Sequence, residues 1–145
     1  MHQSPRATRR KLVIGVATLA LASAGAALVA SQPASAATPN CNSHFRVYVT
    51  ANNGINYPAI GRSTNCILGS GNANDAVFWL QFSLKHCNGF SNLAEDGIYG
   101  RHTADAVRAV QSAHHIPRDG VYGPQTRNAM SWASTNDVTD AISCH

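Results

Sequence analysis

Two stretches of the sequence read almost alike: DGIYGRHTADAV at residues 96–107 and DGVYGPQTRNAM at residues 119–130. They begin 23 residues apart and share the pattern D-G-[IV]-Y-G-x-x-T-x-x-A-[VM]. Agreement of this quality in a chain of 145 residues is unlikely to arise by chance. An internal repeat of this kind indicates one structural unit that is used twice.

Each copy predicts a turn, a buried aromatic ring and a short helix, in that order. Asp-Gly is a turn signature, and the tyrosine follows two residues after the glycine. Pro124 fits the first position of a helix, where its missing N–H costs nothing. By repeat symmetry the earlier helix begins near Arg101, and Pro117 ends it. Ala129, Met130 and Ala133 are expected on the inner face of the later helix.

A further helix is predicted at residues 74–87, before the first copy. Asn74 or Asp75 can cap its beginning, and Asn88-Gly89 is typical of its end. One face carries Val77, Leu80, Gln81 and Leu84. Because neither repeat unit can bury its apolar face alone, this helix is the expected third wall. The predicted fold class is therefore all-α, a small three-helix bundle with two repeated turn–helix units.

The segment before these helices gives weaker signals. Residues 45–50 alternate in a β-prone pattern, and Asn52-Asn53-Gly54 is a turn signal. Residues 55–63 contain Pro58 and Gly61 and are predicted to be irregular. We therefore expect a short irregular or β extension at residues 37–65, followed by the domain at residues 66–145.

Residues 1–36 have the pattern of a secretory signal peptide. Basic residues at 6–11 precede an apolar run at 12–30, and Ala34-Ser35-Ala36 is a small-x-small cleavage site. We expect cleavage after Ala36, which leaves no stable membrane anchor and a secreted, extracellular or wall-associated protein. The alternative is an uncleaved anchor, because the apolar run is just long enough to span a bilayer.

The charge balance gives no argument for nucleic acid as a partner. The chain has 11 Lys and Arg against 7 Asp and Glu. Four of the basic residues lie in the predicted signal peptide, so the exported part carries seven residues of each sign. Neither a polyanion nor an anionic membrane surface is therefore an expected partner.

Four cysteines, at positions 41, 66, 87 and 144, are predicted to form two disulfides. An even number of cysteines is typical of a small exported domain. Three pairings are possible, and we favour Cys41–Cys66 with Cys87–Cys144 because the two loops then do not cross. Closing the longer loop would stabilise the fold by ~4 kcal/mol in the chain-entropy model. A zinc site is the alternative, but the sequence contains no C-x-x-C pair to support it.

The ordered set of motifs resembles the peptidoglycan-binding domain of bacterial cell-wall hydrolases. The motifs are Leu80-Gln81-Phe82-Ser83-Leu84, then residues 96–111, then residues 119–126, and the resemblance covers about residues 66–133. It implies a three-helix fold and noncatalytic binding to the cell wall. The chain departs from the family pattern at Val110, where phenylalanine is usual, and at Arg101, which stands where the second copy has proline.

Residues that flank the two turns are candidates for ligand binding. Arginine suits planar, bidentate contacts to a carboxylate of a stem peptide, and aromatic rings can stack on a sugar. The alternative is a scaffold role, in which aspartates satisfy turn N–H groups and tyrosines fill the core. The candidates are Tyr99, Arg101, His102, Arg118, Tyr122 and Gln125.

The sequence offers no recognisable catalytic set, so we expect no enzyme, cofactor or metal. There is no H-E-x-x-H motif, and the adjacent His114 and His115 would point about 100° apart on a helix. Oxidised cysteines supply no thiolate, and Glu95 is the only glutamate.

The predicted function is therefore a secreted, noncatalytic module that binds peptidoglycan, either its glycan or its stem peptide. The first alternative is a protein–protein interaction module on the same fold, with a secreted protein as its partner. The second alternative is a small cell-wall hydrolase.

Overall fold

The computed structural model describes residues 37–145, and the predicted signal peptide lies outside the described residues. Within the described part, no helix has the length and apolar character needed to cross a bilayer. In chain order the elements are β1 (Ser43–Tyr48), β2 (Asn53–Ala59), α1 (Asp75–Cys87), α2 (Arg101–Ala113), α3 (Pro124–Ala129), β3 (Ala133–Asn136) and β4 (Ile142–Cys144).

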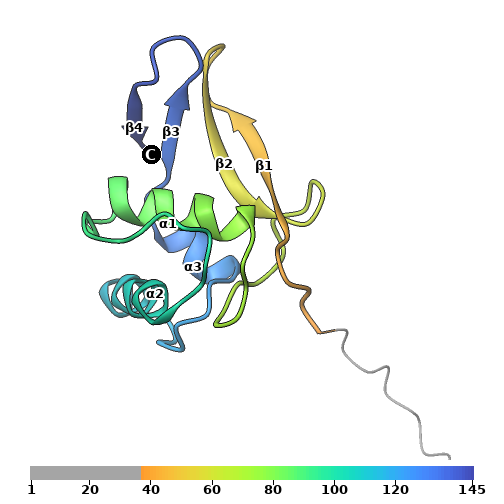
Figure 1. Cartoon of the computed structure of the whole chain (residues 1–145), viewed down its shortest axis with the longest axis vertical. Coiled ribbons are helices and arrows are strands. Elements are labelled where there is room, and N and C mark those ends of the chain that lie inside the picture. Colours follow the sequence, from red (N-terminus) through yellow and green to blue (C-terminus); the bar gives the residue numbers. More distant parts are fainter. Residues whose placement is uncertain (1–36) are drawn as a thin grey trace, which may run out of the picture. The chain divides into compact units, whose positions relative to one another are not determined.

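The four strands form one antiparallel sheet in the order β1-β2-β3-β4. Its two halves come from opposite ends of the described chain, since β2 pairs with β3 through Asn53–Asn136, Gly54–Thr135 and Ile55–Ser134. Figure 1 shows the sheet on one side of α1, with α2 and α3 on the other side. The helix α1 contacts strands and α2, so it is the centre of an α+β architecture.

The predicted all-α fold class is wrong, because the sheet is a major part of the molecule. Residues 55–63 were expected to be irregular, yet 55–59 belong to β2. Pro58 is tolerated because it lies beyond the three residues of β2 that pair with β3, so β2 has a strand neighbour on one side only at this point. The division of the chain at residue 65 stays a prediction.

The predicted helix boundaries agree closely with the structure. The Asn74 side chain accepts a hydrogen bond from Val77 N at 3.1 Å and so caps α1. The helix α2 begins at Arg101, and Pro124 occupies the first turn of α3. One assignment was wrong: Ala133 does not lie on the face of the third helix but begins β3, because α3 ends at Ala129.

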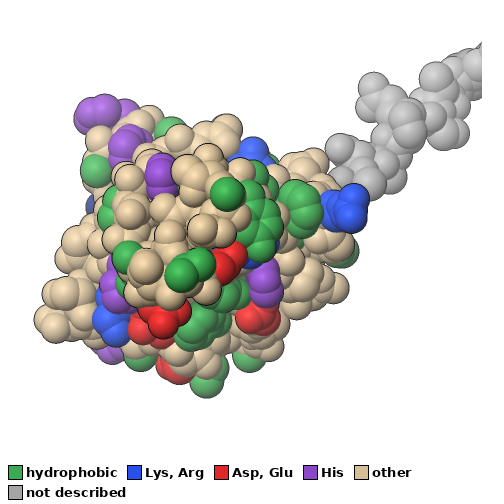
Figure 2. Space-filling view, turned by 90° about the horizontal axis from the view of Figure 1, so that it is seen from above, with side chains coloured by type: hydrophobic (Ala, Val, Ile, Leu, Met, Phe, Trp, Pro, Cys, Tyr) green, Lys and Arg blue, Asp and Glu red, His purple; other side chains and the backbone are tan. Residues whose placement is uncertain are grey.

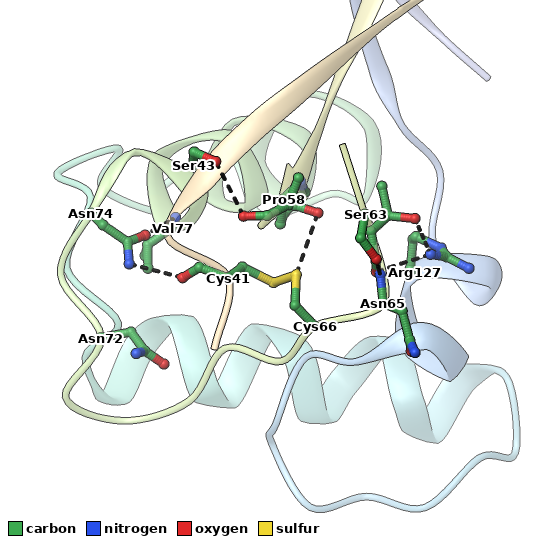
Figure 3. Close-up of a disulfide and its surroundings, with 12 residues drawn as sticks. Cys41, Ser43, Pro58, Ser63, Asn65, Cys66, Asn72, Asn74, Val77 and Arg127 are labelled. Atoms are coloured by element: carbon green, nitrogen blue, oxygen red, sulfur yellow. Dashed lines mark hydrogen bonds between the residues drawn. A yellow bond between two sulfur atoms is a disulfide. The ribbon is translucent and has the colours of Figure 1, made fainter. Parts of the chain in front are cut away.

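Two disulfides brace the fold, and their pairing is the one that the sequence favoured. Cys41–Cys66 links the segments that flank the β1–β2 hairpin, and Cys87–Cys144 links the end of α1 to β4. Figure 3 shows the first of these beside the beginning of α1, where Asn74 Nδ2 donates to Cys41 O at 3.0 Å. One asparagine therefore caps the helix and holds the strand segment against it.

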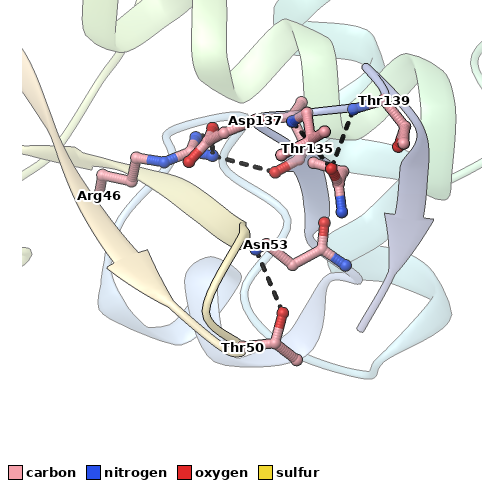
Figure 4. A network of polar contacts seen from close by, with 8 residues as sticks. Arg46, Thr50, Asn53, Thr135, Asp137 and Thr139 are labelled. Atoms are coloured by element: carbon pink, nitrogen blue, oxygen red, sulfur yellow. Dashed lines mark hydrogen bonds and ion pairs between the residues drawn. The ribbon is translucent and has the colours of Figure 1, made fainter.

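The sheet is also tied together by Arg46, which crosses β2 to reach β3 (Figure 4). Its guanidinium donates to Thr135 Oγ1 at 3.1 Å and to Thr135 O at 3.0 Å, and it forms an ion pair with Asp137. Gly54 permits this crossing, because a Cβ there would lie 2.6 Å from Arg46 Nε. Glycine at position 54 therefore leaves room for the Arg46 side chain in this position, and a larger residue would displace it.

Candidate functional site

A buried glutamine fixes the first Asp-Gly turn. Gln81 is 1% exposed, and its Nε2 atom donates to Asp96 Oδ1, Ile98 O and Thr103 Oγ1 at 2.9, 3.0 and 3.0 Å. Its Oε1 atom accepts from Gly97 N at 2.8 Å. Because a buried polar side chain is costly unless it is satisfied, these bonds account for a glutamine on the apolar face of α1.

The second turn repeats this arrangement atom for atom. Gln111 Nε2 donates to Asp119 Oδ1, Val121 O and Thr126 Oγ1 at 2.7, 3.0 and 3.2 Å. Gln111 Oε1 accepts from Gly120 N at 2.9 Å. Each turn–helix unit is therefore attached to the preceding helix by one glutamine, and the repeated aspartate and threonine are its partners.

The aspartate of the first turn is held in its charged form. The backbone N–H of Ile98 and the side chain of Gln81 both donate to Asp96, and they lower the pKa of its carboxyl below the ordinary 3.8. The same oxygen accepts both bonds. The charged carboxyl of Asp96 therefore stabilises the turn, which is the scaffold role considered in the sequence analysis.

The two repeated tyrosines fill the core, which corrects their assignment as ligand contacts. Tyr99 is 2% exposed and Tyr122 is fully buried, so a ligand on the surface cannot stack on either ring. Tyr99 Oη donates to Gly120 O at 2.8 Å and so links the two turns, whereas Tyr122 Oη has no hydrogen-bond partner. Burial raises the pKa of both hydroxyls well above the ordinary range.

A small groove beside the first turn contains two of the predicted ligand residues, Arg101 and His102. It has a volume of about 160 Å³. His102 also lines a cavity of about 380 Å³ between the 89–93 loop and α2. The two hollows adjoin, because Asn92, Leu93 and His102 line both. The first-turn groove is defined by Gln81, Asn92, Leu93, Ala94, Asp96, Ile98, Gly100, Arg101, His102 and Thr103.

Arg101 extends from this groove into solvent. Its side chain is 90% exposed, and within residues 37–145 it forms an ion pair with Asp105 alone, at 3.7 Å and one turn further along α2. An exposed pair of this kind contributes little to stability, so the guanidinium is available to an external carboxylate.

The corresponding groove beside the second turn has a volume of about 370 Å³ and contains Gln125. Its lining repeats the first groove, since Gln111, Asp119 and Thr126 take the places of Gln81, Asp96 and Thr103. Arg118 is exposed and lines neither groove. The structure therefore divides the exposed candidate residues between two related grooves and leaves Arg118 outside both.

A larger cavity, which we call the sheet groove, was missed by the sequence interpretation. It has a volume of about 450 Å³ and lies where β1 and β2 meet the end of α3. Its sequence signal was hidden because it depends on β2, whose residues 55–59 were predicted to be irregular. The sheet groove is lined by Phe45, Val47, Tyr57, Arg62, Thr64, Arg127, Asn128, Met130, Trp132 and His145.

The described residues carry no evident catalytic arrangement. Among residues 37–145, no group of three or more His, Cys, Asp or Glu side chains is placed to hold a metal ion, and all four cysteines are in disulfides. The charged side chains of the face seen in Figure 2 are of both signs and are interspersed with uncharged ones. The noncatalytic assignment nevertheless stays a prediction.

Comparison with known proteins identifies the repeat-bearing segment. Residues 73–130 match the family described as "Putative peptidoglycan binding domain", and through this segment the chain belongs to that family. The resemblance stated from the motifs is confirmed. Family membership supports the bacterial cell wall as the binding partner, and the two disulfides are compatible with an extracellular or wall-associated location.

One solved structure, "The crystal structure of SleB N-terminal domain", is similar to part of the chain. The two are 34% identical, the match covers 44% of this chain and 86% of that chain, and the TM-score is 0.41. A comparison with curated proteins gave no match.

Proposed function

We propose that the protein is an exported, noncatalytic module that binds peptidoglycan at the first-turn groove. The observation that carries this proposal is the family match at residues 73–130, which contains every residue that lines the groove. The adjoining cavity lengthens the groove across the 89–93 loop, which suits an extended polymer better than a compact small molecule.

The chemistry of the groove supports recognition of a polar, carboxylate-bearing chain. Arg101 supplies an exposed guanidinium, and His102 supplies ring nitrogens at the junction of the two hollows. The groove floor is fixed by the Gln81 bonds, so little ordering of the protein is needed when a ligand binds. The predicted signal peptide supports this assignment, because a wall-binding module must reach the wall.

Co-sedimentation with purified, protein-free peptidoglycan sacculi tests the proposal, with cellulose and chitin as control polymers. Saturable pelleting of the oxidised protein with sacculi alone is expected. Protein that stays in the supernatant would contradict the proposal and would favour a protein partner. A fall in the turbidity of the sacculi would contradict the noncatalytic part and would indicate a hydrolase.

Two variants locate the binding surface. Arg101→Ala and His102→Ala should each weaken pelleting, because both side chains are exposed and neither is needed for the core. Arg118→Ala is the matched control, since it removes another exposed arginine that lies outside both grooves. Equal losses in Arg101→Ala and Arg118→Ala would show a nonspecific charge effect instead of a site.

A further inference from the structure

The sheet groove combines an apolar floor with two arginines. The rings of Tyr57 and Trp132 lie with centroids 4.7 Å apart, and Phe45 and Val47 from β1 add apolar surface beside them. The Trp132 ring is fixed, because its Nε1 atom donates to Arg127 O at 2.8 Å. The floor can therefore bury an apolar group without rearranging.

Arg127 presents a positioned guanidinium whose partners are all neutral. Its Nη1 atom donates to the carbonyl oxygen of Thr64 at 3.0 Å and also to the hydroxyl oxygen of Thr64. Its Nε and Nη2 atoms donate to Asn128 Oδ1 at 3.2 and 3.1 Å. Figure 3 shows Arg127 directed at the 63–65 segment. A guanidinium has five N–H donors, so one remains without a partner among residues 37–145, and no Asp or Glu side chain in that range pairs with the positive charge.

Arg62 adds a second positive charge to the same groove. It is exposed and makes no hydrogen bond or ion pair with residues 37–145. None of the ten lining residues is Asp or Glu, and among the described residues no carboxylate side chain pairs with either arginine. The positive charge of Arg127 also acts on Tyr57 in the floor of the groove. Burial raises the pKa of the Tyr57 hydroxyl, and the charge of Arg127 partly offsets this rise.

We propose that the sheet groove is a second binding site, which takes the carboxylate end of a peptide. The carboxylate is held by Arg62 and Arg127, and the apolar side chain next to it packs on the accessible surfaces of Val47 and Tyr57, with the buried Trp132 ring beside Tyr57. Charge complementarity favours an anion, and the apolar floor favours one whose neighbouring group is apolar. A polyol phosphate chain would leave the accessible apolar surfaces of Val47 and Tyr57 in contact with polar atoms.

This site does not depend on the proposed function of the first-turn groove. Most of its lining, including Tyr57, Arg62 and Trp132, lies outside the family match at residues 73–130. The carboxylate end could come from a protein, where the residues are L-amino acids, or from a wall stem peptide that ends in D-amino acids. Stereochemistry therefore distinguishes the two sources.

Titration of the oxidised protein with N-acetyl-alanyl-alanine, followed by NMR, tests the proposal. The L,L and D,D dipeptides are each compared with the corresponding C-terminal amide. Saturable shifts are expected at the Trp132 indole N–H and the Arg127 Nε–H for at least one free acid. Amidation should weaken binding by about tenfold or more, because it removes charge-assisted hydrogen bonds.

Arg62→Ala should weaken binding of the free acid by about tenfold and leave the fold intact, since Arg62 has no partners to lose. Arg118→Ala should bind as the parent does. Arg127→Lys keeps the charge but loses the fork, so it should reduce the preference for acid over amide. The proposal is overturned by equal affinity for acid and amide, by an unchanged affinity in Arg62→Ala, by shifts confined to residues 101–103, or by no binding of either stereoisomer at millimolar concentration.

Discussion

Replacing Gln81 with leucine should destabilise the protein strongly. The two side chains are similar in volume, so the packing around position 81 should change little. The substitution removes the four bonds that hold the first turn. Thr103 is 2% exposed and the Gly97 N–H is partly buried, so at least two groups lose a partner without free access to water. Each such group costs about 1–3 kcal/mol, and a better-buried leucine offsets part of this loss. The expected net loss is about 2–4 kcal/mol in the free energy of unfolding.

Urea denaturation followed by tryptophan fluorescence, with both disulfides intact, measures this loss. The midpoint should fall while the m-value stays constant, since the surface exposed on unfolding is the same. Gln111→Leu should lose at least as much, because Gly120 is more buried than Gly97. Gln125→Leu is the matched control at an exposed glutamine and should stay within about 0.5 kcal/mol of the parent. A Gln81→Leu variant as stable as the control would refute a role for this glutamine in holding the turn.

Three further predictions concern stability. Tyr99→Phe should lose about 1 kcal/mol because it breaks the bond to Gly120 O, whereas Tyr122→Phe should be neutral or stabilising because its hydroxyl has no partner; thermal melts that rank them oppositely would contradict this. Gly54→Ala should displace Arg46 and lower the urea midpoint by more than Gly100→Ala, where a Cβ meets open space and φ is −89°. The pKa of Asp96 is lower in the folded state than in the unfolded state, so the unfolded state binds more protons and the stability falls as the pH drops below about 4. The Asp96→Asn variant should therefore lose less stability than the parent between pH 6 and pH 3. An equal loss in the variant and the parent would contradict this role of Asp96.

The helices could be predicted because their signals are local. Asn74 caps α1 through an atom three residues away, and Pro124 fixes the first turn of α3 by its own ring. The glutamines were visible as polar residues within the apolar motifs, but their role needed the distances to Asp96 and Asp119. Local chemistry thus determined where helices begin and end.

The sheet could not be predicted because its determinants are distant in the chain. The strand β3 has four residues, and it depends on β2 about 80 positions earlier and on Arg46 passing over Gly54. The sheet groove was hidden for the same reason, since β1, β2 and the segment after α3 must meet before it exists. The tyrosines were misassigned because a repeated aromatic residue has the same pattern in a core and in a binding site.

An NMR titration with soluble peptidoglycan fragments, with the fragment masses determined before and after incubation, tests the proposed function in one experiment. The proposal predicts saturable shifts at residues 101–103 and in the 91–94 loop, whatever occurs at the sheet groove, with unchanged fragment masses. Saturable binding of the fragments without chemical-shift changes in those two segments would contradict the first-turn groove as the binding site. A change in the fragment masses would contradict a noncatalytic module.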